Sequence, residues 1–187
     1  MHTIYLARHA AALPGEEQDP GLSAAGQAQA DALGRRLAAE PIRTVLHSPR
    51  ARARQTARAV AVHLPGARLE ATDLLDDRTA VPSPGRTDEY PAHRHAWLEQ
   101  VPPAERDVDG RLMTSAWERL SAPGPAGGVL LVTHAFVVGW FVREVLGAPP
   151  AAWLRLMPVP NAGLTVVGSD RYGERTLELF NATDHLP

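Results

Sequence analysis

The 187-residue sequence contains no cysteine and no lysine. Without cysteine the chain has no disulfides, no thiolate metal ligands and no cysteine nucleophile, so its chemistry must use histidine, carboxylate, hydroxyl or arginine side chains. All 19 basic residues are arginine, which indicates a compositional bias alongside the many alanines and prolines. An arginine is therefore treated as a functional candidate only where its position supports that interpretation.

A strong charge of either sign is also missing. The formal net charge is −2, which gives no global basic field, so we expect neither nucleic acid nor a membrane surface as a partner. The longest apolar stretch, 129–146, is interrupted by His134, Arg143 and Glu144, and is not expected to span a bilayer. The first residues lack the basic and apolar pattern of a signal peptide. We expect a cytoplasmic protein.

An apolar content of 44% in 187 residues is enough for one sizeable core, and we expect a single domain over 1–187. Strand-like and helix-like segments alternate along the chain. The expected strands are 4–7, 44–46, 68–71, 129–133, 164–167 and 176–179, and the expected helices are 23–40, 48–63, 111–121 and 136–146. This order predicts an α/β fold, a three-layer α/β/α sandwich with a mostly parallel central sheet.

The segment 73–109 interrupts this alternation. It is acidic and proline-rich, and we expect it to be irregular apart from a possible short helix over 92–99. Long irregular segments in a compact domain often form lids or loops that face a substrate. The segment is therefore interpreted as a substrate-facing insertion.

Two histidines directly follow expected strands. His9, preceded by Arg8, ends the run "IYLARHA", and His134 follows the apolar strand 129–133. Either histidine alone is more typical of a structural residue. In parallel sheets, however, ligands bind beyond the carboxyl ends of the strands, so the fold can bring both histidines together.

The segment "HSPRARARQTA" supplies a second element. Ser48 is expected to cap a helix that has Pro49 at its first position. Arg52 then lies in the first turn, where free backbone N–H groups and the helix dipole already favour an anion. Arg8 and Arg52 could together form a phosphate cradle, whereas the other arginines of the segment are interpreted as surface residues.

Four motifs in order resemble the histidine phosphatase superfamily, the phosphoglycerate mutase-like proteins. They are "LARHA", "LSAAGQAQA", "SPRARARQTA" and "VLLVTHAFVVG". The resemblance implies that His9 is a nucleophile that becomes phosphorylated, and that Arg8, Arg52 and His134 bind the phosphoryl oxygens. Phosphoryl transfer requires positioning and charge neutralisation, and nearby cations keep the attacking imidazole neutral. No cofactor and no metal is implied.

The sequence departs from this family at two points. Ala10 and Ala135 follow the two histidines, where glycine is frequent in the family; alanine is tolerable there if the backbone angles are ordinary. The general acid, usually a carboxylic acid after the third strand, falls within "DLLDDRTAVPSPG". Asp76 and Asp77 are both candidates, with Asp77 preferred because it begins the irregular segment. A solvated acidic turn explains either residue equally well.

The function expected from these residues is hydrolysis of phosphate monoesters through a phosphohistidine intermediate on His9. Two alternatives remain: a phosphoglycerate mutase-type phosphotransferase, and a non-catalytic phospholigand-binding protein. Mutases of this family carry additional segments that shield the phosphoenzyme, so the short chain favours a phosphatase. The substrate, a phosphorylated small molecule or a phosphoprotein, and the oligomeric state are left open. His47 is interpreted as a packing residue, and Asn161 as part of a turn with a possible supporting role.

Overall fold

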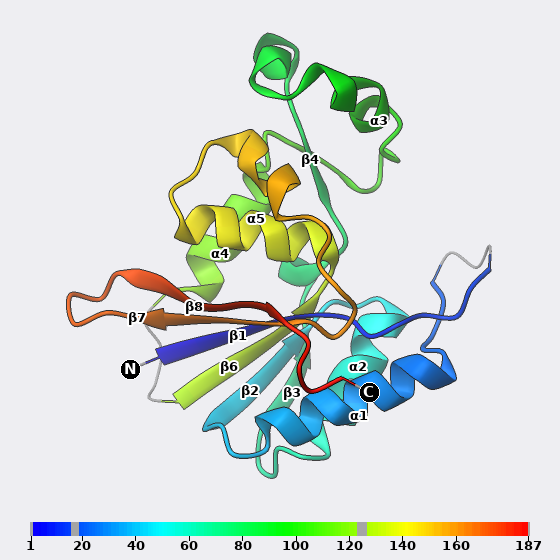
Figure 1. Cartoon of the computed structure of the whole chain (residues 1–187), viewed down its shortest axis with the longest axis vertical. Helices are drawn as coiled ribbons and strands as arrows, with labels where there is room; N and C mark the ends of the chain where they lie inside the picture. The colour runs from blue at the N-terminus through cyan, green and yellow to red at the C-terminus, as the bar shows by residue number, and fades with distance from the viewer. Residues whose placement is uncertain (1, 16–18, 123–126, 187) are drawn as a thin grey trace.

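The computed structural model describes residues 2–15, 19–122 and 127–186, and a six-stranded sheet in the order β3-β2-β6-β1-β7-β8 lies at its centre (Figure 1). The strands are β1 (His2–Arg8), β2 (Ile42–His47), β3 (Arg68–Ala71), β6 (Gly127–Thr133), β7 (Leu164–Ser169) and β8 (Arg175–Ala182). The first four run parallel, whereas β7 pairs antiparallel with both β1 and β8. The predicted α/β class with a mostly parallel sheet is confirmed.

Helices cover both faces of this sheet (Figure 1). α1 (Ala24–Leu37) and α2 (Ala51–Ala61) lie on one face, and α4 (Arg111–Leu120) and α5 (Ala135–Val145) on the other. The alternation within β1 explains the two layers, because successive side chains of a strand point to opposite faces. Ile4 and Leu6 join the core beneath α5, whereas Tyr5 and Ala7 join the core beneath α1 and α2. The three-layer sandwich follows from this pattern.

The segment 73–109 is more ordered than the sequence predicts. The predicted helix over 92–99 is confirmed as a 3₁₀ turn, η3 (Ala92–Arg94), continued by α3 (His95–Glu99). The expectation of an otherwise irregular segment is wrong, because β4 (Thr79–Val81) and β5 (Arg106–Val108) pair as a second, parallel sheet. The other short elements are the 3₁₀ turns η1 (Asp73–Leu75), η2 (Pro84–Glu89) and, after α5, η4 (Pro150–Leu156). Strands of three residues are too short to show an alternation in sequence.

The start of α2 also differs from its prediction. The helix begins at Ala51 rather than at Pro49, and its N-cap is Arg50, which makes no side-chain capping bond. Ser48 still belongs to the sheet edge, because its N–H donates to the carbonyl of Val132 at 3.0 Å. Its hydroxyl accepts from the N–H of the N-cap residue Arg50 at 3.3 Å, and the structure shows no bond from it to an N–H of Ala51–Ala61.

The longest apolar run of the sequence is divided between two elements, β6 and α5. Each of them is too short to cross a bilayer. Within the described ranges, no helix combines the length and the apolar character that a membrane span requires.

Candidate active site

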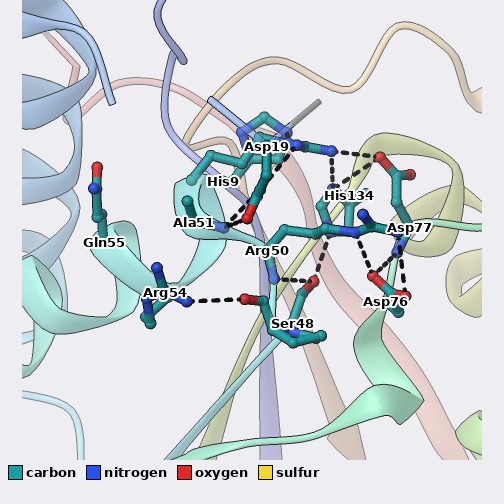
Figure 2. A network of polar contacts seen from close by, with 12 residues as sticks. His9, Asp19, Ser48, Arg50, Ala51, Arg54, Gln55, Asp76, Asp77 and His134 are labelled. Carbon is teal, nitrogen blue, oxygen red and sulfur yellow. Dashed lines mark hydrogen bonds and ion pairs between the residues drawn. The ribbon is translucent and has the colours of Figure 1, made fainter. Parts of the chain in front are cut away.

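Three neighbouring strands, β2, β6 and β1, end at the same edge of the sheet. Arg8 pairs with Thr133, so the residues that follow β1 and β6 lie at one level, and because His47 pairs with Val132 the residue that follows β2 lies one position earlier along the sheet. Those residues are Ser48, His134 and His9. Figure 2 shows their side chains converging, and the centroids of the two imidazole rings are 5.2 Å apart.

His9 is held with one ring nitrogen toward the backbone and the other toward an arginine. Its Nδ1 lies 2.8 Å from the carbonyl oxygen of Ala10, which can only accept, so Nδ1 carries the proton. Nε2 then has a free lone pair, to which Arg52 Nε donates at 3.2 Å. Burial is the main cause that lowers the pKa of His9 to about 3, and the charges of Arg52 and Arg8 contribute. The ring is neutral at physiological pH, and its Nε2 lone pair is available.

The backbone around His9 is fixed by the loop before β7 and by α2. Asn161 Nδ2 donates to the carbonyl of His9 at 2.9 Å, and the N–H of Ala162 contacts the same oxygen at 3.4 Å. The N–H of Ala10 donates to Thr56 Oγ1 at 3.0 Å. Asn161, expected in a turn with a possible supporting role, thus supports the segment that carries His9.

The two alanines after the histidines fit their positions. Neither Ala10 nor Ala135 is among the described residues with a positive φ angle. Alanine therefore costs no backbone strain at either place, as expected from the sequence.

The two arginines approach the histidines from different elements. Arg52, the second residue of α2, is largely buried, and its Nη2 donates to Asp77 Oδ2 at 2.7 Å. Arg8 Nη1 donates to the carbonyl of Val159 at 2.7 Å, whereas Arg8 Nε is buried and has no hydrogen-bond partner among the described residues. Burial lowers the pKa of the Arg8 guanidinium, and Asp77 opposes that effect. An unpartnered arginine N–H is suited to an anion.

His134 is 2% exposed and has a polar partner at each ring nitrogen. Nε2 lies 2.8 Å from Ser48 Oγ, and Nδ1 lies 3.2 Å from Asp77 Oδ2. Burial, supported by His9 and Arg52, lowers the pKa of His134 to about 2. This ring is neutral as well.

Asp77 is the carboxylate that faces the histidines. Burial raises its pKa to about 6, and the negative charge of Glu105 acts in the same direction, against the opposing charge of Arg52. A pKa in this range suits a group that gives and takes a proton near neutral pH.

The other candidate acid has a different environment. Asp76 accepts from Arg50 Nε at 2.8 Å and from the backbone N–H of Asp77 at 2.9 Å. Its carboxylate therefore orders the loop, and no described contact joins it to either histidine.

Two carboxylates near the site are not indicated by the sequence. Asp19 accepts from the N–H of Ala51 at 2.8 and 3.0 Å, so it caps α2 from a loop 32 residues away, and it lies 3.8 Å from Arg52 Nη1. Glu105 precedes β5 and acts on Asp77 through space. No local sequence pattern indicates either residue as part of the site, because each is brought near the site only by the tertiary fold.

Among the described residues, no three histidine, aspartate or glutamate side chains cluster in a way that could hold a metal ion. The arginines and imidazoles described above are thus the groups available to an anion at this edge. Metal independence stays a prediction.

Known proteins resemble the chain in sequence and in fold. The mitochondrial serine/threonine-protein phosphatase Pgam5 of Caenorhabditis briggsae is 30% identical over 170 residues, which cover 87% of this chain and 56% of that protein. PGAM5 of Mus musculus is 26% identical over 180 residues, or 91% and 58% of the two chains. The chain thus spans little more than half the length of these curated relatives.

Solved structures give the same fold over the whole length of both chains. YhfR of Bacillus stearothermophilus superposes with a TM-score of 0.79 at 19% identity, and phosphoserine phosphatase of Entamoeba histolytica with a TM-score of 0.74 at 16% identity. The profile of the histidine phosphatase superfamily, branch 1, matches residues 4–183. With the two histidines and the arginines at the carboxyl edge of this fold, the chain belongs to the histidine phosphatase superfamily.

Proposed function

We propose that the protein hydrolyses phosphate monoesters through a phosphohistidine intermediate on His9. The observation that carries this proposal is the state of the His9 ring, which is neutral, with Nδ1–H bound to a carbonyl and the Nε2 lone pair directed at Arg52. A phosphoryl group that displaces this arginine contact would meet the nucleophilic nitrogen directly.

In the first step, Nε2 of His9 attacks phosphorus, so a P–N bond forms while the bond to the leaving oxygen breaks. Arg8, Arg52 and His134 neutralise the equatorial oxygens, which is the main requirement of phosphoryl transfer. In the second step, water attacks phosphorus, the P–N bond breaks, and inorganic phosphate leaves with His9 restored.

Asp77 is the proposed general acid. Its raised pKa allows a protonated fraction near neutral pH, and it contacts both Arg52 and His134. It would give its proton to the leaving oxygen in the first step, then take a proton from the attacking water in the second.

The substrate class is proposed only as phosphate monoesters, either small molecules or phosphoproteins. Relatives and structural neighbours are named as a serine/threonine-protein phosphatase, a phosphoserine phosphatase and a glucosyl-3-phosphoglycerate phosphatase. Both substrate types therefore belong in a panel, which should include phosphoserine, phosphoglycerates, a phosphoserine peptide and a phosphohistidine protein. Conversion of one phosphoglycerate isomer into another, without release of phosphate, would favour the mutase alternative.

Hydrolysis of p-nitrophenyl phosphate by the wild type and by His9→Ala tests the proposal. We expect turnover and an acid-labile phosphoenzyme only in the wild type. Equal rates in the two proteins would refute His9 as the nucleophile. Phosphate binding without turnover in the wild type would favour a phospholigand-binding protein. Unchanged activity in a chelator is expected from the proposed metal independence.

The cytoplasm is our proposed location, although the curated relatives are named as mitochondrial proteins. Cell fractionation of a tagged full chain, with matrix and cytosolic markers as references, would distinguish the two compartments.

A further inference from the structure

The hydroxyl of Ser48 lies at the centre of a contact that the proposed reaction does not use. Ser48 is fully buried, directly follows β2, and places its Oγ 2.8 Å from Nε2 of His134. The backbone N–H of Arg50 donates to the same Oγ at 3.3 Å. One lone pair of the hydroxyl is therefore occupied, and its hydrogen still needs an acceptor.

Among the described residues, Nε2 of His134 is the only acceptor within hydrogen-bond distance of that hydroxyl. If Nε2 carried the ring proton instead, the Ser48 hydrogen would be buried without a partner. An unpaired buried polar group of this kind is unfavourable, because it loses its hydrogen bond to water and gains none in the protein. The hydroxyl thus favours an imidazole whose Nε2 accepts and whose Nδ1 carries the proton.

The other side of the ring gives the same answer. Nδ1 lies 3.2 Å from Asp77 Oδ2, an ionised oxygen that can only accept when the pH is well above 6. Arg52 Nη2 is 3.4 Å from Nδ1, but it has a much shorter bond of 2.7 Å to the same Asp77 oxygen. An unprotonated Nδ1 would face the carboxylate with a lone pair, and only the long arginine contact would compensate.

We propose that Ser48 is a positioning residue that holds neutral His134 in its Nδ1–H tautomer, so that the ring donates this N–H to a phosphoryl oxygen. The inference rests on the proposed function for the identity of the anion. The tautomer itself is a property of the resting protein. In the absence of an anion, this N–H donates to Asp77 Oδ2. When a phosphoryl group binds, the N–H stays on the ring and donates to a phosphoryl oxygen instead.

This arrangement solves a problem of burial. A protonated imidazolium at a site that is 2% exposed, beside Arg52 and Arg8, would carry a large desolvation and repulsion cost. A neutral ring can still donate one hydrogen bond, provided that its proton is on the nitrogen that faces the phosphate. Ser48 fixes that choice without adding charge.

Side-chain ¹⁵N NMR of histidine-labelled protein tests the tautomer directly, because protonated and unprotonated ring nitrogens resonate far apart. At a pH well above 6, we expect His134 of the wild type to show a protonated Nδ1 and an unprotonated Nε2. Assignment uses the loss of these signals in His134→Asn. A protonated Nε2 in the wild type would overturn the inference, even if the protein proves to be an active phosphatase.

Ser48→Ala provides the second arm, with Thr165→Val as the control because it removes a different buried hydroxyl, on β7, that contacts neither histidine. In Ser48→Ala we expect a mixture of His134 tautomers and an affinity for inorganic phosphate, titrated by ³¹P NMR, about tenfold weaker, equal to about 1.4 kcal/mol. Thr165→Val should change neither. Wild-type tautomer and phosphate affinity in Ser48→Ala would overturn the inference.

The phosphate titration also separates this inference from the proposed function. A wild type that binds phosphate with Nδ1–H but hydrolyses no ester would refute the phosphatase proposal and leave the role of Ser48 intact. If Ser48→Ala does not fold, the ¹⁵N NMR measurement of the His134 tautomer in the wild type still tests the inference.

Discussion

His9 and His134 are buried side by side with pKa values lowered to about 3 and about 2, chiefly by desolvation. In the unfolded chain both rings return to the ordinary value near 6.5. The unfolded state therefore binds protons that the native state does not, which links folding to pH. The stability gained from neutral burial is complete above pH 6.5 and is lost as pH falls from there toward 3.

We predict that acid destabilises the wild type more than a variant that lacks one buried imidazole. At about pH 5, 1.5 units below the ordinary value, each buried histidine costs about 2 kcal/mol. Between pH 7 and pH 5, the free energy of unfolding of His134→Asn should fall by about 2 kcal/mol less than that of the wild type. Urea unfolding measures both. His93→Asn, at an exposed position, is the control. Identical pH slopes for wild type and His134→Asn would contradict the prediction.

Asp77 and Asp76 are adjacent in sequence but should differ in their effects on catalysis. Asp77→Asn should reduce turnover of an alkyl phosphate about 10²-fold or more, and turnover of p-nitrophenyl phosphate much less, because only a poor leaving group needs the proton. Asp76→Asn, which breaks the contact with Arg50, should affect both substrates alike. A reversal of the two patterns would assign the acid to Asp76.

The pH profile provides a separate check on Asp77. The acid must be protonated, so turnover of the alkyl phosphate should fall as pH rises through about 6. The substrate phosphate also titrates near this value, and it does so equally in both proteins. Turnover of Asp77→Asn relative to the wild type should therefore rise across this range. A constant ratio would count against the assignment.

At this scale, the sequence predicts residues that stand at strand ends. His9, His134 and Arg8 could be placed because the end of a strand is visible in its apolar pattern. Arg52 could be placed because it falls in the first turn of an expected helix and its segment resembles a family motif. Asn161 could be placed in a turn, with a supporting role left possible by the resemblance. Asp19 and Glu105 could not be assigned to the site, because their contacts with it come from distant parts of the chain.

At the scale of elements, the start of α2 depends on a residue outside the helix. Its Ala51 N–H, one of the free donors of a first turn, is satisfied by the Asp19 carboxylate rather than by Ser48. Ser48 was predicted as the cap because a sequence pattern considers only the residues just before a helix. The backbone N–H of Ser48 instead bonds to Val132 of β6, and its hydroxyl lies beside His134.

Asp19→Ala should therefore loosen the first turn of α2. We expect the Ala51 amide to exchange with solvent faster, and the free energy of unfolding to fall by about 1 kcal/mol, the usual value of a lost cap. Ser23→Ala is a matched control, because Ser23 caps α1 through the N–H of Gly26 and should leave Ala51 unchanged. Hydrogen exchange by NMR distinguishes the two, and unaltered Ala51 exchange in Asp19→Ala would refute the role of Asp19.

For the whole molecule, the question is whether the insertion folds with the sheet. Tyr90, Leu98 and Val101 of the insertion are buried in the same apolar cluster as Phe141 of α5 and Leu131 of β6. A unit that shares its core with the sheet cannot expose that core without destabilising both. We therefore propose that residues 1–187 unfold as one cooperative domain.

Leu98→Ala tests this proposal. Leu98 is 2% exposed, so its truncation should cost about 2–5 kcal/mol, and in a cooperative molecule the whole cost appears in the unfolding of the central sheet. The midpoint of urea unfolding, followed by far-UV circular dichroism, should fall, and hydrogen exchange should become faster in the insertion and in the central sheet together. Leu112→Ala, at a position that is 53% exposed, is the control and should change little. Faster exchange confined to the insertion in Leu98→Ala, with the exchange of the sheet unchanged, would mean that the insertion is a separate folding unit. The stretch that supplies Asp77 and Glu105 would then order independently of the histidines.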